Sequence, residues 1–180
     1  MKIIANGVAN LTDARYFAAM GVDWIGFDMG TDSPLSIEHV IAFSDWVEGP
    51  LFYLDVRGRP EEQIAEMLGS FQADGLRTEE GVSLPHYAGK IISVRQNSDI
   101  VNDHADILIY SFEEWQQIIS NNEAIVAEEA WIAVDNANEY RSLNTSIDLI
   151  MGIVVSGGDE EKTGLKPYDD LDEIMELVNG

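Results

Sequence analysis

The most informative segment of the chain runs from Leu149 to Lys166 and reads LIMGIVVSGGDEEKTGLK. Its first half is a short apolar run, rich in β-branched residues, that stops at Ser156, Gly157 and Gly158. Such a run is typical of a buried strand that opens into a loop. Because glycine has no Cβ, the N–H groups of this loop can approach a ligand closely, and bare N–H groups bind phosphate oxygens. A simple turn of the chain at the two glycines is the alternative.

Length and composition indicate one globular domain that covers residues 1–180. Nearly half of the residues are hydrophobic, which is enough for a real core. No apolar run approaches the ~20 residues of a membrane span, and the first residues lack the apolar segment of a signal peptide. We therefore expect a cytoplasmic protein. The absence of cysteine rules out disulfides and thiolate chemistry.

The charge is strongly acidic, with 33 Asp and Glu against 10 Lys and Arg and a net charge of −23. Nucleic acids and anionic membranes are themselves negative, so neither is expected as a partner. The three histidines, His39, His86 and His104, show no spacing typical of metal ligands. We therefore expect no metal and no other cofactor, while composition carries no information on the oligomeric state.

Eight apolar runs predict eight strands. They cover residues 2–5, 24–27, 51–54, 75–78, 90–94, 106–110, 131–134 and the run that ends before Ser156. Predicted helix starts lie at Asn10 or Thr12, Ser36, Pro60, Ser111, near Ala137 and near Asp169. The four tryptophans fall at strand or helix core spacing and are expected to pack in the core: Trp24, Trp46, Trp115 and Trp131.

This alternation of strands and helices predicts a parallel sheet covered by helices. Eight such units form a closed (βα)8 TIM barrel. The strands recur at intervals of roughly 16 to 27 residues, and the shortest intervals leave room for only a turn or two of helix. We therefore expect one or two shortened or missing helices. An open, doubly wound sheet is the alternative fold.

The succession of strand ends resembles phosphoribosylanthranilate isomerase, the single-domain (βα)8 enzyme of tryptophan biosynthesis. The motifs that carry the resemblance occur in order at residues 4–14, 21–27, 33–34, 73–76, 104–109 and 152–166. The resemblance implies binding of a phosphorylated sugar derivative. It also implies an Amadori-type conversion of an aldose into a ketose, which needs a general acid and a general base.

The residues at the family's two proton-transfer positions differ from the family pattern. Asn6 stands where the family has a Cys base at the end of the first strand, and Tyr110 stands where it has an Asp acid at the end of the sixth. An amide cannot take a proton near neutral pH, and a phenol with a pKa of about 10 is a weak acid. Asp28 and Asp55 end neighbouring strands and are candidate replacement bases, with loop capping as the alternative.

Binding residues are also partly replaced. Leu35 stands where the family has an Arg for the anthranilate carboxylate, and Val134-Asp135 replaces a phosphate-binding Gly-Gly. Six of the ten cations nevertheless follow strand ends by our assignment: Arg57, Arg59, Arg77, Arg95, Lys162 and Lys166. We expect them to favour an anionic ligand at this end of the barrel. Arg77 and Arg95 are then candidate substrate-binding residues, beside the phosphate-binding loop at residues 156–158.

Two functions from different classes remain open. The first is an isomerase-like enzyme that acts on a phosphorylated small molecule, with Tyr110 as the acid and Asp28 or Asp55 as the base. The second is a non-catalytic paralogue that serves as a binding or interaction protein. Turnover of phosphoribosylanthranilate distinguishes the two.

Overall fold

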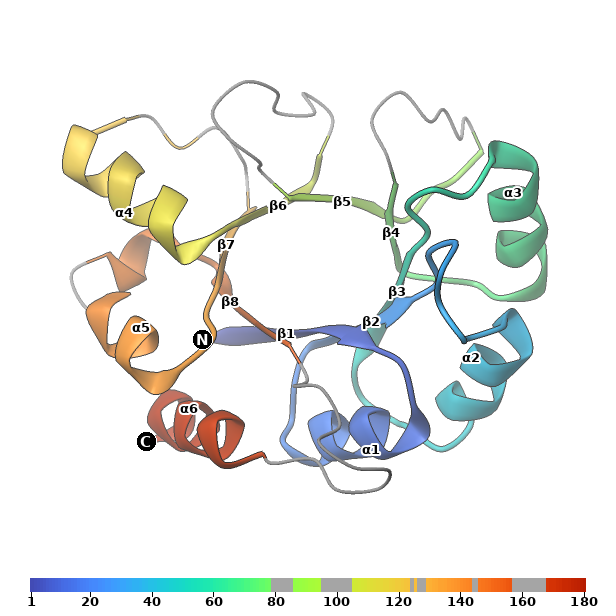
Figure 1. Ribbon diagram of the computed structural model, residues 1–180, viewed down its shortest axis with the longest axis horizontal. Helices are drawn as coiled ribbons and strands as arrows, with labels where there is room; N and C mark the ends of the chain where they lie inside the picture. The colour runs from blue at the N-terminus through green and yellow to red at the C-terminus, as the bar shows by residue number, and fades with distance from the viewer. Residues whose placement is uncertain (79–85, 95–104, 124, 126–128, 144–145, 157–167) are drawn as a thin grey trace.

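Eight parallel strands close into a barrel in the computed structural model, which describes residues 1–78, 86–94, 105–123, 125, 129–143, 146–156 and 168–180. The strands are β1 (Lys2–Val8), β2 (Trp24–Asp28), β3 (Leu51–Asp55), β4 (Gly75–Arg77), β5 (Lys90–Val94), β6 (Ile107–Tyr110), β7 (Glu129–Ala133) and β8 (Gly152–Ser156). Each strand pairs with the next, and β8 pairs with β1, so the sheet has no edge (Figure 1). The predicted TIM barrel is confirmed, and the open sheet is excluded.

Helices surround the barrel on its outside (Figure 1). They are α1 (Leu11–Ala19), α2 (Ile37–Ser44), α3 (Glu61–Ser70), α4 (Phe112–Asn121), α5 (Ala137–Ser142) and α6 (Asp169–Asn179), with a 3-10 turn η2 (Ile147–Leu149). The described residues between β4 and β5 contain no helix, and α5 has only 6 residues. The short α5 confirms the expectation of a shortened helix.

The helices begin where the sequence places their caps. The Asn10 side chain accepts a hydrogen bond from the Asp13 N–H at 2.9 Å at the start of α1. Ser111 forms the predicted capping box at the start of α4. Ser36 forms a capping box as well, although its partner is His39 rather than an acidic residue. Each cap satisfies N–H groups that the first helical turn leaves without a partner.

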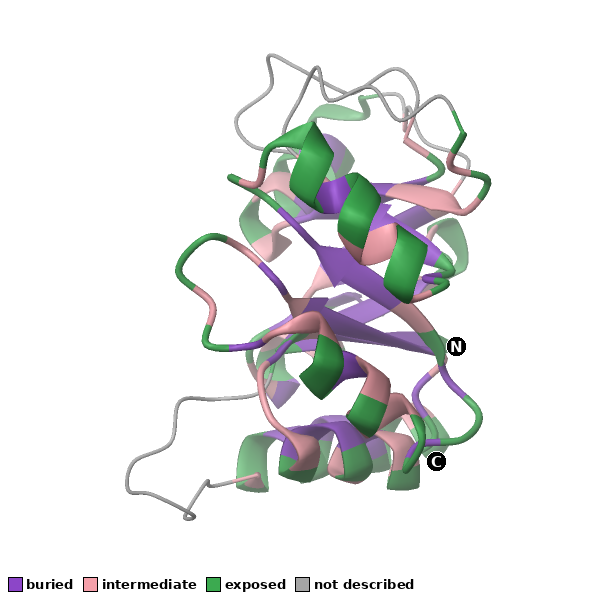
Figure 2. Cartoon of the chain, turned by 90° about the vertical axis from the view of Figure 1, so that its right-hand side faces the viewer, coloured by how far each residue is buried: buried purple, intermediate pink, exposed green. Residues whose placement is uncertain are grey.

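The barrel wall separates two apolar cores, because alternate strand residues face opposite sides of the sheet. Inside the barrel lie Ile4, Trp24, Tyr53, Ile92, Ile107, Ile109, Trp131 and Val154. The larger core fills the layer between the sheet and the helices, and Figure 2 shows buried residues on the strands and on the inner sides of the helices. The helices' outer sides are exposed, which is the pattern of a barrel packed from both faces.

One tryptophan departs from the expected packing. Trp24 and Trp131 lie inside the barrel, and Trp115 lies in the outer core. Trp46, in contrast, is 70% exposed, so its predicted core position was wrong. It follows the end of α2, where helical spacing no longer decides which way a side chain points.

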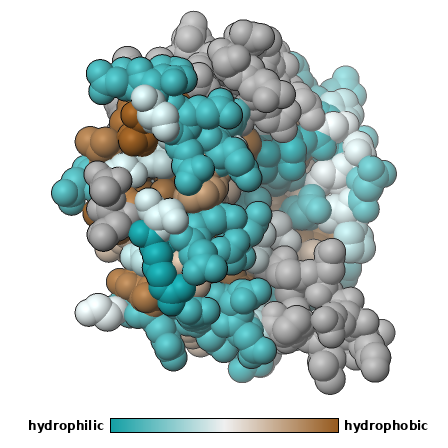
Figure 3. Space-filling view, turned by 60° about the vertical axis from the view of Figure 1, so that its left-hand side comes forward, coloured by the Kyte–Doolittle hydropathy of each residue, from teal (hydrophilic) through white to brown (hydrophobic). Residues whose placement is uncertain are grey.

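The outer surface is mostly hydrophilic on the face shown in Figure 3, with apolar residues in small separate patches. This matches the acidic composition of the chain. Among the described residues, no helix combines the length and the apolar character that a bilayer span needs.

Candidate functional site

The carboxyl ends of the strands form the mouth of the barrel, and strand alternation decides which side chains face it. Ile4 and Val154 belong to the inner core, and two residues further along their strands lie Asn6 and Ser156. These two residues are direct partners in the register of β1 and β8. Ser156 is exposed and Asn6 is half-buried, so both can reach a ligand in the mouth.

Asn6 is held by a tyrosine from inside the barrel. The Tyr53 hydroxyl donates a hydrogen bond to Asn6 Oδ1 over 2.5 Å, and the Tyr53 side chain is fully buried. Burial raises the pKa of the Tyr53 phenol above its ordinary value of 10.0, so the phenol stays protonated and remains a donor. Because the amide oxygen is occupied by Tyr53, the Asn6 NH2 group is the end that remains for another partner.

Two inward-facing glycines make room for the Tyr53 ring. A Cβ at Gly26 on β2 would lie 2.0 Å from Tyr53 Cζ, and a Cβ at Gly75 on β4 would lie 2.9 Å from Tyr53 Cβ. Real Cβ atoms do not approach so closely, so any side chain at Gly26 displaces the ring. From the sequence alone, Tyr53 is expected only to lie in a strand. The signal that could have identified it is this pair of glycines on the two strands beside it.

The ends of β2, β3 and β4 carry a buried ion pair. Asp28 pairs in register with Asp55, and Asp55 with Arg77, so the two aspartates are neighbours at the ends of β2 and β3. Asp55 accepts from Arg77 Nη1 at 3.0 Å and from Arg57 Nε and Nη2 at 2.8 and 2.9 Å. Asp55 and Arg77 are only 5% and 7% exposed. The role of Asp55 that the geometry supports is to neutralise two guanidinium groups.

Asp28 caps its own loop. Its Oδ1 accepts from the Gly30 N–H at 3.1 Å, a local turn in which the side chain bonds to the backbone two residues on. This is the loop-capping alternative considered for strand-end carboxylates. Arg59, also counted among the cations of the mouth, donates to the carbonyl oxygens of Met29 and Gly30, both at 3.0 Å. Arg59 therefore ties the loop after β3 to the loop after β2.

Tyr110 faces away from the mouth, which contradicts its assignment as the acid. Its side chain is fully buried in the outer core, and its ring centre lies 5.7 Å from that of Trp115 on α4. Ile109 faces the barrel interior, so Tyr110, the next residue, faces the opposite side. The error was one residue in register, which moves a side chain to the other face of the sheet. The next position on the inward face is Ser111, whose hydroxyl caps α4.

A pocket of about 370 Å³ opens between the loops after β2 and β3. Its lining residues are Asp28, Gly30, Thr31, Asp32, Ser33, Pro34, Asp55, Arg57 and Gly58. In the described part of the chain, no group of three or more His, Asp or Glu side chains is arranged to hold a metal ion. The predicted binding residues Gly157, Gly158 and Arg95, and the cations Lys162 and Lys166, lie outside the described residues.

The fold and the polar strand ends define a (βα)8 barrel with its candidate site at the carboxyl-terminal mouth. Solved structures with the same architecture include TrpF from Jonesia denitrificans, with 17% identity, a TM-score of 0.74, and coverage of 100% of this chain and 97% of that chain. Phosphoribosyl anthranilate isomerase from Thermus thermophilus has 16% identity and a TM-score of 0.70 over 99% and 98% of the two chains.

A third such structure is a phosphoribosyl anthranilate isomerase in complex with reduced 1-(o-carboxyphenylamino)-1-deoxyribulose 5-phosphate. It has 15% identity and a TM-score of 0.73, and the match covers 100% of this chain and 99% of that chain. No family model and no curated protein sequence matches this chain. At such identities the likeness shows the fold: the chain has the fold of the phosphoribosylanthranilate isomerases, as its strand ends predicted.

Proposed function

We propose that this protein binds a small phosphorylated metabolite in the mouth of its barrel and does not catalyse the aldose–ketose isomerisation. The observation that carries the proposal is the Asn6 carboxamide, fixed by the Tyr53 hydroxyl at the end of β1. This group can hold a ligand through its NH2, but it can neither take nor give a proton near neutral pH.

Support for ligand binding comes from the polar groups beside Asn6. Ser156 is exposed and adjacent in register, so its hydroxyl and the Asn6 NH2 offer two hydrogen-bond donors side by side. Phosphate and sugar oxygens accept such bonds. The mouth is also where this fold places its sites, and one solved neighbour is a complex with a ribulose 5-phosphate derivative. We place the phosphate of the ligand beside Ser156, with Gly157 and Gly158 as further candidate donors.

Support against isomerisation comes from the groups that would have to move protons. General acid and base catalysis contribute about 10²- to 10⁴-fold each. Asn6 cannot act as the base, Tyr110 lies on the wrong side of the sheet, and Asp55 is bound by two arginines. An active isomerase would have to rely on Asp28, whose Oδ1 already accepts a backbone N–H. The non-catalytic paralogue is therefore the reading that the geometry favours.

Thermal unfolding with ribose 5-phosphate tests the binding proposal. A ligand at 100 times its Kd stabilises the folded state by about 2.7 kcal/mol, so the Tm should rise with ligand concentration. Ser156→Asp places a negative charge against the phosphate and should abolish the rise. Ser142→Asp makes the same change on the exposed side of α5 and should preserve it. A wild-type Tm that ribose 5-phosphate does not move, or equal responses of the two variants, would contradict the proposal.

A further inference from the structure

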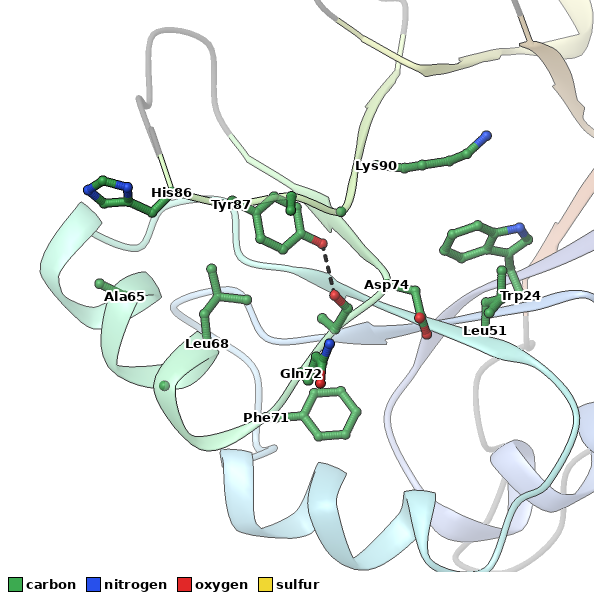
Figure 4. A pocket seen from close by; sticks show the side chains of 14 residues that line it. Trp24, Leu51, Ala65, Leu68, Phe71, Gln72, Asp74, His86, Tyr87 and Lys90 are labelled. Atoms are coloured by element: carbon green, nitrogen blue, oxygen red, sulfur yellow. Dashed lines mark hydrogen bonds between the residues drawn. The ribbon is translucent and has the colours of Figure 1, made fainter.

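A second pocket, of about 760 Å³, lies at the opposite, amino-terminal end of the barrel (Figure 4). Its lining includes Trp24, Leu51 and Lys90, which are the first residues of β2, β3 and β5. It also includes Asp74, which directly precedes β4. Its volume is that of a small-molecule site, which typically measures about 300 to 1,000 Å³. It shares no residue with the pocket between the loops after β2 and β3.

The walls of this pocket are largely apolar and aromatic. Leu68 from α3 and Phe71, just after α3, line one side, while Tyr87 and Trp24 line the others (Figure 4). Tyr87 is fixed in place because its hydroxyl donates to the Ala73 carbonyl at 3.2 Å. Aromatic faces held in this way can stack on a flat ring and attract a cation.

The polar groups of the pocket give it a negative character. Asp74 is exposed and uses Oδ2 to accept the Phe52 N–H at 2.9 Å, while its Oδ1 has no hydrogen-bond partner among the described residues. The charge of Lys90 is neutralised by an ion pair with Glu129. Burial, followed by the charges of Asp74 and a second nearby carboxylate, raises the pKa of Tyr87. Asp74 is therefore the carboxylate that lines this pocket, together with His86 and with Lys90, whose charge is paired with Glu129.

We propose that this pocket is a second binding site, for a small molecule with an aromatic or apolar body and one protonated amine. The body packs against Phe71, Tyr87 and Trp24, and the amine bonds to Asp74 Oδ1. This site is separate from the mouth of the barrel and does not depend on the function proposed for it. The strongly acidic surface raises the local concentration of cations and favours the same class of ligand.

Calorimetric titration of the full chain with tryptamine and with indole-3-propionate tests the proposal, because the two probes share a ring system and differ in the sign of their charge. We expect one saturable site for tryptamine and binding about threefold to fivefold weaker for indole-3-propionate, the range set by an exposed charge pair. Gly69 lines the pocket, and a Cβ there meets nothing within 4 Å. Gly69→Leu should therefore fill the pocket without disturbing α3 and weaken both probes.

A matched pair of charge variants separates a contact with Asp74 from general attraction to an acidic protein. Asp74→Asn keeps an oxygen for the Phe52 N–H but removes the charge, and should remove the preference for tryptamine. Glu66→Gln removes one charge from α3 outside the pocket and should leave that preference unchanged. The proposal is overturned if tryptamine shows no saturable binding, if Gly69→Leu binds it as the wild type does, or if the two charge variants behave alike.

Discussion

Tyr53 is the residue around which the inner part of the mouth is built. Its ring fills the space left by two glycines, and its hydroxyl fixes the orientation of the Asn6 amide. A hydrogen bond from a buried hydroxyl to a buried or half-buried amide stabilises the folded state modestly when both groups are present. The cost is larger when one partner is removed and the other is left without a bond. Substitution of Tyr53 therefore tests how much this hydrogen bond stabilises the protein.

Tyr53→Phe should lower the free energy of unfolding by about 1 to 3 kcal/mol, because it leaves Asn6 Oδ1 without its donor. Urea denaturation at neutral pH measures the change. Tyr140→Phe is the matched control, since the Tyr140 hydroxyl makes no hydrogen bond among the described residues, and it should have little effect. Equal losses of unfolding free energy in the two variants would show that the hydrogen bond between Tyr53 and Asn6 does not stabilise the protein.

The same tyrosine predicts a dependence on alkaline pH. Its pKa is raised in the folded state, so above the ordinary value of 10.0 the unfolded chain loses the proton while the folded chain keeps it. The stability gained from Tyr53 is complete below that pH and falls above it. The difference in the free energy of unfolding between wild type and Tyr53→Phe should therefore narrow by about 1.4 kcal/mol per pH unit above pH 10. Unfolding curves that stay parallel from pH 9 upward would contradict the assignment.

At the scale of elements, the barrel repeats one contact at its amino-terminal end. The residue directly before each of β2, β4 and β6 is an aspartate whose carboxylate accepts an N–H of the preceding strand. The pairs are Asp23 with Ile3, Asp74 with Phe52 and Asp106 with Ile91, at 2.8, 2.9 and 2.7 Å. The corresponding residue before β8 is Met151, whose N–H donates to the Ala130 carbonyl at 2.8 Å. The start of β8 thus has the same backbone hydrogen bond to the preceding strand, but no carboxylate beside it.

Met151→Asp should complete the repeat and raise the free energy of unfolding by about 1 kcal/mol, through a new bond to the Ala130 N–H. Met151 is 37% exposed, so the change displaces little apolar packing. Met151→Glu carries the same charge on a longer side chain and should not stabilise the protein. Chemical denaturation measures the free energy of unfolding of both variants. Equal values would show that an aspartate before β8 does not form the contact that the three aspartates make before β2, β4 and β6.

The elements themselves could be predicted because their signals are local. Helix caps such as Asn10 and Ser111 act within one turn of the chain, and the apolar runs between them mark the strands. Side-chain direction at the mouth was less predictable. The difference between the inward and outward faces is a single residue, and at β6 the side chain expected in the mouth, Tyr110, lies in the outer core.

The side-chain contacts between strands could not be predicted from the sequence, for a different reason. The bond from Tyr53 to Asn6 joins residues 47 positions apart, and the ion pair from Arg77 to Asp55 joins residues 22 apart. The existence of such contacts depends on register across the sheet. The adjacency of Asp28 and Asp55 could be foreseen because parallel neighbours end at the same edge. The arginines that bind Asp55 could not be foreseen from composition alone.

At the scale of the whole molecule, the net charge of −23 sets the response to salt. Mutual repulsion of surface carboxylates destabilises the compact state, and salt screens it: the Debye length falls from about 30 Å at 0.01 M to about 3 Å at 1 M. The Tm should therefore rise steadily with sodium chloride over this range. A Tm that is constant or falls would show that the carboxylates on the hydrophilic surface (Figure 3) are not a net source of repulsion.

We propose that this barrel keeps the phosphoribosylanthranilate isomerase fold without the proton-transfer groups at its mouth. The most direct measurement is turnover of phosphoribosylanthranilate, followed by the loss of its fluorescence at high protein concentration, with an active isomerase of the same fold as the reference. We expect a rate no higher than that of a buffer blank for the wild type. A wild-type rate above the blank that disappears in Asp28→Asn would show that the barrel still catalyses the isomerisation, with Asp28 as its base.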